Sequence, residues 1–116
     1  MATFAKQNLS ASTNGRGILV GTTDTTIHTG STTTTVYDEI WLYATNVTTS
    51  ASKLTVKWGG TTEAGDFIEQ LIPGESGLIL VVPGLLIRGV ATALIVRATA
   101  ADANALVIHG YVNRIS

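Results

Sequence analysis

The chain has 116 residues, a formal net charge of −1 at neutral pH and no cysteine. This length suits one domain with its own hydrophobic core, and the lack of cysteine excludes disulfides and thiolate chemistry. The seven Lys and Arg residues are scattered, so the sequence offers no basic surface for nucleic acid. Charged residues make up only 13% of the chain, about half the usual share, which indicates a surface that partly faces other protein.

The first fifteen residues mix small and polar side chains and end in Asn14-Gly15, a dipeptide typical of turns. We expect them to form an arm, residues 1–15, ahead of a single domain, residues 16–116. The segment lacks the apolar stretch of a secretory signal, so we expect the protein to be made in the cytoplasm. Because such an arm can tie subunits together, Phe4 and Leu9 are candidate contact residues.

Strand-like runs follow the arm, and the stretch from Val36 to Ala44 alternates with a two-residue period. One face carries Val36, Asp38, Ile40, Leu42 and Ala44, and the other carries Tyr37, Glu39, Trp41 and Tyr43. Aromatic side chains on the nominal solvent face are typical of a strand that contacts a neighbouring subunit. Loops of the same chain could equally cover that face, so both interpretations stay open here.

The middle of the chain continues the β pattern. Residues 53–58 alternate cleanly, and we expect Leu54, Val56 and Trp58 to point inward from a half-buried strand. A glycine-rich turn, residues 59–65, then leads into a strand over residues 67–72, which Pro73-Gly74 closes.

The most apolar stretch, residues 77–96, raises the question of a membrane helix. Such a helix needs about 20 consecutive apolar residues. Pro83-Gly84 and Arg88 interrupt the run, and the longest uncharged piece, residues 77–87, is too short. We therefore predict three strands buried on both faces, over residues 78–82, 85–87 and 93–96, and no contact with a membrane.

A last strand-like run, Leu106 to Ile115, ends almost at the end of the chain. With it the sequence predicts about eight strands, no helix and regularly spaced turns. This pattern is typical of an all-β fold, a single-domain antiparallel β-sandwich of jelly-roll type.

No group of residues predicts catalysis, a cofactor or a metal site. His28 and His109 could share a metal with Asp24 or Asp102, but no metal-binding spacing occurs, and a lone strand histidine is more often a structural hydrogen-bonding group. Acidic residues around the glycine-rich turn indicate a solvated hairpin rather than a calcium loop or a glycosidase pair; they are Glu63, Asp66 and Glu69. Sugar binding stays open for the aromatic residues, which are Trp41, Tyr43, Trp58 and Tyr111.

Four segments resemble small all-β virion proteins that tailed bacteriophages encode among their structural genes; they are YDEIWLYATN, LTVKWGG, IPGESGLILVVPGLLI and ADANALVIHGYVNRI. The resemblance runs from Ile27 to Ile115 and lies in the order of strands and turns, with a closing GYVNRI strand. It contains no catalytic motif. It implies a non-enzymatic virion protein, made in the host cytoplasm, that is built as a sandwich without cofactors and often decorates the capsid or sits at the neck or tail.

The residues and the resemblance together favour a capsid decoration protein that binds itself and the major capsid protein. We expect a homo-oligomer, specifically a trimer, because repetition around an axis multiplies weak contacts. The expected contact residues are Tyr37, Trp41, Tyr43, Phe4 and Leu9. The alternatives are a head-tail connector, tail or fibre component and, from another class, a carbohydrate-binding sandwich module.

Overall fold

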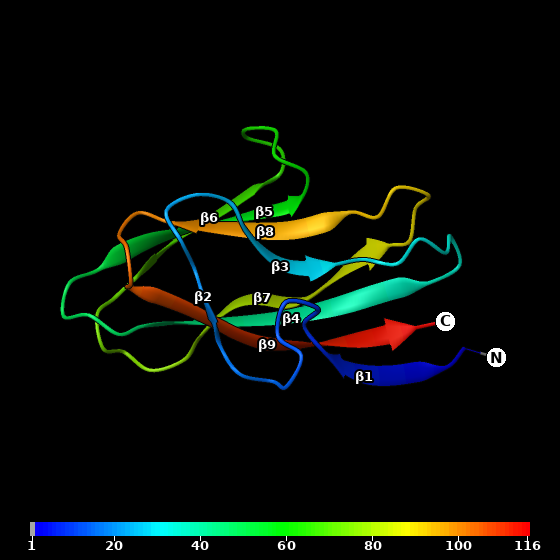
Figure 1. The fold of residues 1–116 in the computed structure, drawn as a ribbon, viewed down its shortest axis with the longest axis horizontal. Helices are drawn as coiled ribbons and strands as arrows, with labels where there is room; N and C mark the ends of the chain where they lie inside the picture. Colours follow the sequence, from blue (N-terminus) through cyan, green and yellow to red (C-terminus); the bar gives the residue numbers. More distant parts are fainter. Residues whose placement is uncertain (1) are drawn as a thin grey trace.

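Two antiparallel sheets pack face to face and enclose the core between them (Figure 1). The structure, a computed structural model, describes residues 2–116. Over these residues its strands are β1 (Phe4–Asn8), β2 (Ile18–Leu19), β3 (Thr25–Thr29), β4 (Tyr37–Asn46), β5 (Ser52–Gly59), β6 (Phe67–Ile72), β7 (Ile79–Arg88), β8 (Ile95–Ala100) and β9 (Leu106–Ile115). Nowhere in this range does the chain form a helix that is long and apolar enough to cross a membrane.

The order of the strands is that of a jelly roll. The five-stranded sheet runs β1-β9-β4-β7, with the short β2 also paired to β9, and the four-stranded sheet runs β3-β8-β5-β6. Only the β1–β2 and β5–β6 connections stay within one sheet. The chain crosses between the layers at each of the remaining connections, as in Greek-key folds. The expected all-β antiparallel sandwich is confirmed.

Inward-facing side chains of both sheets build one continuous core. On β4 the expected alternation is confirmed, because Ile40, Leu42 and Ala44 are fully buried. The alternation on β5 is confirmed as well: Leu54 and Val56 are fully buried, and Trp58 packs partly buried against the same core. Because these side chains close around one another, the two layers hold together without disulfides.

The prediction of three strands buried on both faces is wrong for the apolar stretch. Residues 79–88 form the single strand β7, and the third predicted strand is displaced into β8. β7 lies at the edge of the five-stranded sheet, where only β4 pairs with it, and the outer face of that sheet carries no further layer. Leu80 and Leu86 consequently remain 44% and 53% exposed.

Pro83 and Gly84 bend β7 without ending it. The register against β4 shifts just before Trp41, which pairs with Pro83, and again between Leu42 and Tyr43. A proline is tolerated there because an edge strand has one side free of ladder hydrogen bonds. Gly84 has a φ of +77°, and the indole ring of Trp41 occupies the space that a Cβ at this position would need.

Most of the expected N-terminal arm belongs to the domain. Strand β1 pairs with β9 from Phe4 opposite Ile115 to Asn8 opposite Tyr111, which brings the two chain ends together (Figure 1). Leu9 lies in the core at 2% exposure. The separation of residues 1–15 from the sandwich is therefore wrong, because β9 offers backbone groups for pairing and Leu9 offers apolar surface for burial. Met1 lies outside the described residues.

Replacing Gly84 by Ala should destabilise the protein by about 2 kcal/mol. A Cβ at this position would lie 2.8 Å from Cζ2 of Trp41, and a side chain at positive φ adds about 1 kcal/mol of strain. Gly65→Ala is the matched control, because a Cβ there meets no atom within 4 Å. Urea unfolding of both variants measures the difference, and equal stabilities would contradict this role of Gly84.

Candidate functional site

The outer face of the five-stranded sheet gathers aromatic and apolar side chains from three strands. Residues directly opposite in an antiparallel pair share a face. Tyr111 on β9 lies opposite Trp41, and on β7 Leu80 lies opposite Tyr43 and Leu86 opposite Glu39. We call this surface the aromatic face; it comprises Tyr37, Trp41, Tyr43, Leu80, Leu86 and Tyr111.

Contacts within the sheet hold the central rings of the aromatic face in place. The rings of Trp41 and Tyr111 stack with their centroids 6.2 Å apart and an angle of 12° between their planes. The indole Nε1 of Trp41 donates a 2.9 Å hydrogen bond to Glu39, and the Lys6 ammonium lies 5.2 Å from the Tyr111 ring centre. A surface whose rings are already ordered loses little side-chain entropy when it binds.

The structure brings most of the expected contact residues together. Tyr37, Trp41 and Tyr43 share the aromatic face, and Phe4 extends it because it lies opposite Ile115, which in turn lies opposite Tyr37. Leu9 is the exception. It is 2% exposed and packs in the core, so its assignment as a contact residue is wrong, and the physical reason is that its apolar side chain is already buried.

Loops of the same chain leave Tyr37 and the β7 side of the aromatic face exposed, whereas Trp41, Tyr43 and Tyr111 are half-buried. Tyr37 is 40% exposed and Leu86 is 53% exposed in the single chain. Sequence reasoning missed the parts of this face that come from β7 and β9. The two-residue period of β9 could have placed Tyr111 on an outer face, but Leu80 and Leu86 appeared to belong to a strand buried on both sides.

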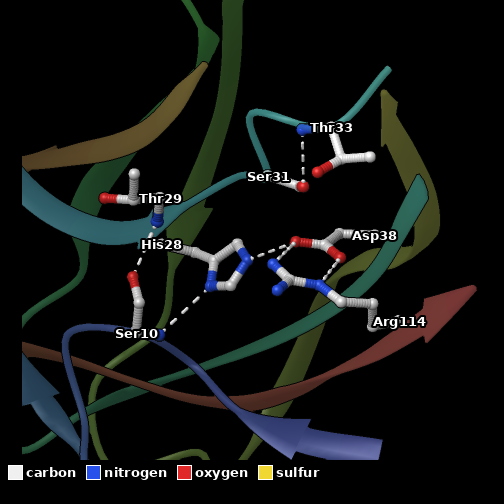
Figure 2. Close-up of polar contacts among 7 residues, drawn as sticks. All are labelled: Ser10, His28, Thr29, Ser31, Thr33, Asp38 and Arg114. Atoms are coloured by element: carbon white, nitrogen blue, oxygen red, sulfur yellow. Dashed lines mark hydrogen bonds and ion pairs between the residues drawn. The ribbon is translucent and has the colours of Figure 1, made fainter. Parts of the chain in front are cut away.

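A buried polar cluster at one end of the sandwich joins the two sheets (Figure 2). Asp38 on β4 is 1% exposed and accepts hydrogen bonds from Arg114 on β9, 2.7 Å from Nε to Oδ1 and 2.8 Å from Nη2 to Oδ2. His28 on β3, 2% exposed, lies 2.8 Å from the same carboxylate through its Nε2. A buried carboxylate with both oxygens bound to a guanidinium has its charge balanced in place.

The hydrogen bonds around His28 define one tautomer of its ring. The backbone N–H of Ser10 donates to Nδ1 at 3.1 Å, so Nδ1 must be the unprotonated nitrogen and Nε2 donates to Asp38. The hydroxyl of Ser10 does not face the ring; it accepts a 2.7 Å hydrogen bond from the backbone of Thr29 (Figure 2). Ser10, His28 and Asp38 therefore do not have the geometry of a hydrolytic triad.

The contacts within the cluster lower the pKa of the Asp38 carboxyl. Burial by itself raises the pKa of this carboxyl, but the hydrogen bonds from Arg114 and His28, together with their charges, more than offset burial and lower its pKa from 3.8 to about 2. Asp38 therefore stays ionised at neutral pH.

The other candidate sites from the sequence do not assemble. His109 lies on the outer face opposite Tyr43, away from His28, and Asp24 pairs with Lys57. Near the glycine-rich turn, Asp66 accepts a hydrogen bond from the Thr62 backbone, and Glu69 pairs with Lys53. Across residues 2–116 no three His, Cys, Asp or Glu side chains gather closely enough to hold a metal ion, and no pocket is found in that range.

Replacing Asp38 by Asn should destabilise the fold by about 3 kcal/mol at neutral pH, because it leaves Arg114 partly buried without its counter-charge. Glu39→Gln is the matched control. It lies next in the chain on the outer face, and a glutamine can still accept the Trp41 hydrogen bond. Urea unfolding should show a loss within about 0.5 kcal/mol for the control; a similar loss for both variants would contradict the role of the cluster.

The stability that Asp38 contributes should disappear in acid. Its pKa is lower in the folded protein, about 2, than the ordinary 3.8, so this contribution is complete above pH 4 and is lost as the pH falls through 2. The difference corresponds to about 2 kcal/mol. Urea unfolding of the wild type and Asp38→Asn at pH 5 and pH 2.5 should show their stabilities converging in acid. A constant gap between them would contradict this assignment.

No family model matches the chain, and no curated protein or solved structure is significantly similar to it.

Proposed function

We propose that this protein is a capsid decoration protein of a tailed bacteriophage, which stabilises the phage head by binding the major capsid shell as a homotrimer. The single observation that carries the proposal is the partly exposed aromatic face of the five-stranded sheet. Monomeric proteins rarely expose such a contiguous apolar surface without a partner. The resemblance of four sequence segments to phage virion proteins supplies the identity of that partner.

The aromatic face has the size of a protein contact. Its three strands, β4, β7 and β9, have ten residues each. At about 3.3 Å per residue and 4.8 Å between strands, the flat area is on the order of 500 Å² before the relief of the side chains is counted. Stable interfaces bury about 800 Å² on each partner, so this face supplies most of one interface.

The chemistry of the aromatic face also suits protein contact. Interface centres are rich in aromatic residues and poor in charge. On this face the charge of Glu39 is engaged by the Trp41 ring nitrogen, and the charge of Lys6 lies over the Tyr111 ring. A partner that covers the face therefore meets ordered rings, with the charges of Glu39 and Lys6 already in contact with them and Arg88 opposite Tyr37 at the border.

The jelly-roll topology is compatible with this role but does not decide it. Jelly rolls occur in viral capsid proteins and also in lectins. Because one fold carries many functions, this is an analogy at the level of the fold. A head-tail connector, tail or fibre component would use the same face within a ring instead of a trimer.

Carbohydrate binding is the second candidate function, and one observation favours it. The rings of Trp41 and Tyr111 are nearly parallel and half-buried on the outer face of the sheet, and an aromatic surface can receive the apolar face of a sugar. A glycan array with the purified protein tests this candidate. Saturable binding that Trp41→Ala abolishes would favour the sugar-binding module over the capsid role.

Placing two lysines on the aromatic face should prevent self-association. In the double variant Leu80→Lys with Leu86→Lys both side chains start from exposed positions, so the fold should tolerate them, while buried charges at a contact are costly. Leu71→Lys is the matched control, because Leu71 is 62% exposed on the four-stranded sheet. Light scattering behind a sizing column should give a trimer mass for the wild type and the control and a monomer mass for the double variant.

Three other results would change the proposal. A ring of higher copy number would favour the connector, and a wild-type monomer would contradict a self-assembled trimer. A double variant that remains trimeric would show that the subunit contact lies elsewhere.

A deletion that tests whether the N-terminal strand contributes to the trimer is best limited to residues 2–8, because a longer deletion would remove Leu9 from the core.

A further inference from the structure

The N-terminal segment is attached to the sandwich in an unusual way. All five side chains of β1 are exposed, so the strand is held by its backbone pairing with β9 and buries none of its own side chains. The residues that anchor this part of the chain to the sandwich follow β1. Leu9 enters the core, and the backbone N–H of Ala11 donates to Ile27 on β3. We define residues 3–8 as the N-terminal segment.

Ser10 connects this segment to the buried polar cluster (Figure 2). Its hydroxyl accepts a hydrogen bond from the Thr29 backbone, and its own N–H donates to Nδ1 of His28. His28 in turn donates to Asp38, which Arg114 holds from the other side. The chain of hydrogen bonds thus runs from Ser10, just after the N-terminal segment, through β3 and β4 to β9.

We propose that His28 is a pH-sensitive latch that holds the N-terminal segment on the sandwich when its ring is neutral and releases it when the ring is protonated. In the neutral ring Nδ1 is an acceptor for the Ser10 N–H. Protonation adds a hydrogen to Nδ1, which then faces the Ser10 N–H across the present 3.1 Å, so that two donors oppose each other. This inference does not rest on the proposed virion role.

The charged groups that face His28 determine which of its two hydrogen bonds breaks when the ring is protonated. From β4, Asp38 stabilises a protonated ring and keeps it in position through Nε2. From β9, the Arg114 guanidinium binds the same carboxylate and holds it in place. The ring and its carboxylate therefore stay where they are, and the Ser10 side must move. The segment can do so while Leu9 stays in the core, because β1 loses only backbone hydrogen bonds with β9.

Release of the segment would change the surface of the protein. The outer edge of β9, from Tyr111 to Ile115, would lose its pairing with β1 and become free to pair with another strand. Lys6 would also leave the ring of Tyr111, at the border of the aromatic face.

NMR of the ¹⁵N-labelled wild-type protein between pH 8 and pH 4.5 tests the latch directly. The imidazole nitrogen signals of His28 report its protonation, and the backbone amide signals of Gln7 and Ser10 report the attachment of the segment. We expect these amide signals to move to disordered positions with the same midpoint as the His28 ring, while the amide of Leu54 in the core stays unchanged.

Two histidine variants complete the experiment. His28→Gln is uncharged and should remove the transition of the segment, and His109→Gln is the matched control, because it removes the other histidine and should leave the transition unchanged. The wild-type titration alone still decides the matter if His28→Gln does not fold. The latch is wrong if the segment stays attached while His28 titrates, if the transition persists in His28→Gln, or if His28 stays neutral until the whole domain unfolds.

Discussion

The side chains of β4 point alternately to the two faces of the five-stranded sheet, and this alternation governs both the core and the outer surface. β4 is flanked by β9 on one side and β7 on the other, with ten residues in its run. Its inward positions carry Ile40, Leu42 and Ala44 between two polar residues, Asp38 and Asn46. A shift of one residue in register would place the aromatic side chains in the core and expose the buried carboxylate, so the register is strongly specified.

The two polar ends of that inward row serve the same purpose at opposite ends of the sandwich. Asp38 binds Arg114 and His28, which ties β3 and β9 to β4. Asn46 donates to the backbone of Ser50 and Ile72 and accepts from Thr48, which orders the connection to β5 and fastens the end of β6. Buried polar groups of this kind are costly unless every partner is present, so they specify the arrangement of strands as well as stabilise it.

The low charge of the chain bears on the proposed contact at the outer face of β4. The chain has few charges, and they are placed unevenly over the sheet edges. The edge strands β1 and β6 carry Lys6 and Glu69, whereas β7 has no charge before Arg88. Charges at edges normally protect sheets from association. The β7 edge adjoins the aromatic face, so its uncharged stretch, residues 79–87, is continuous with the surface that carries the rings.

The sequence by itself determined the all-β class, the alternation of β4 and β5 and the shared face of Tyr37, Trp41 and Tyr43, because a two-residue period depends only on neighbours in the chain. Only the tertiary structure decided which strands lie at the edges, and it thereby exposed Leu80 and Leu86 and buried Leu9. It also decided the partners of Asp38, since Arg114 lies 76 residues away in the chain. Strand pairing joins distant segments, and no local pattern carries that information.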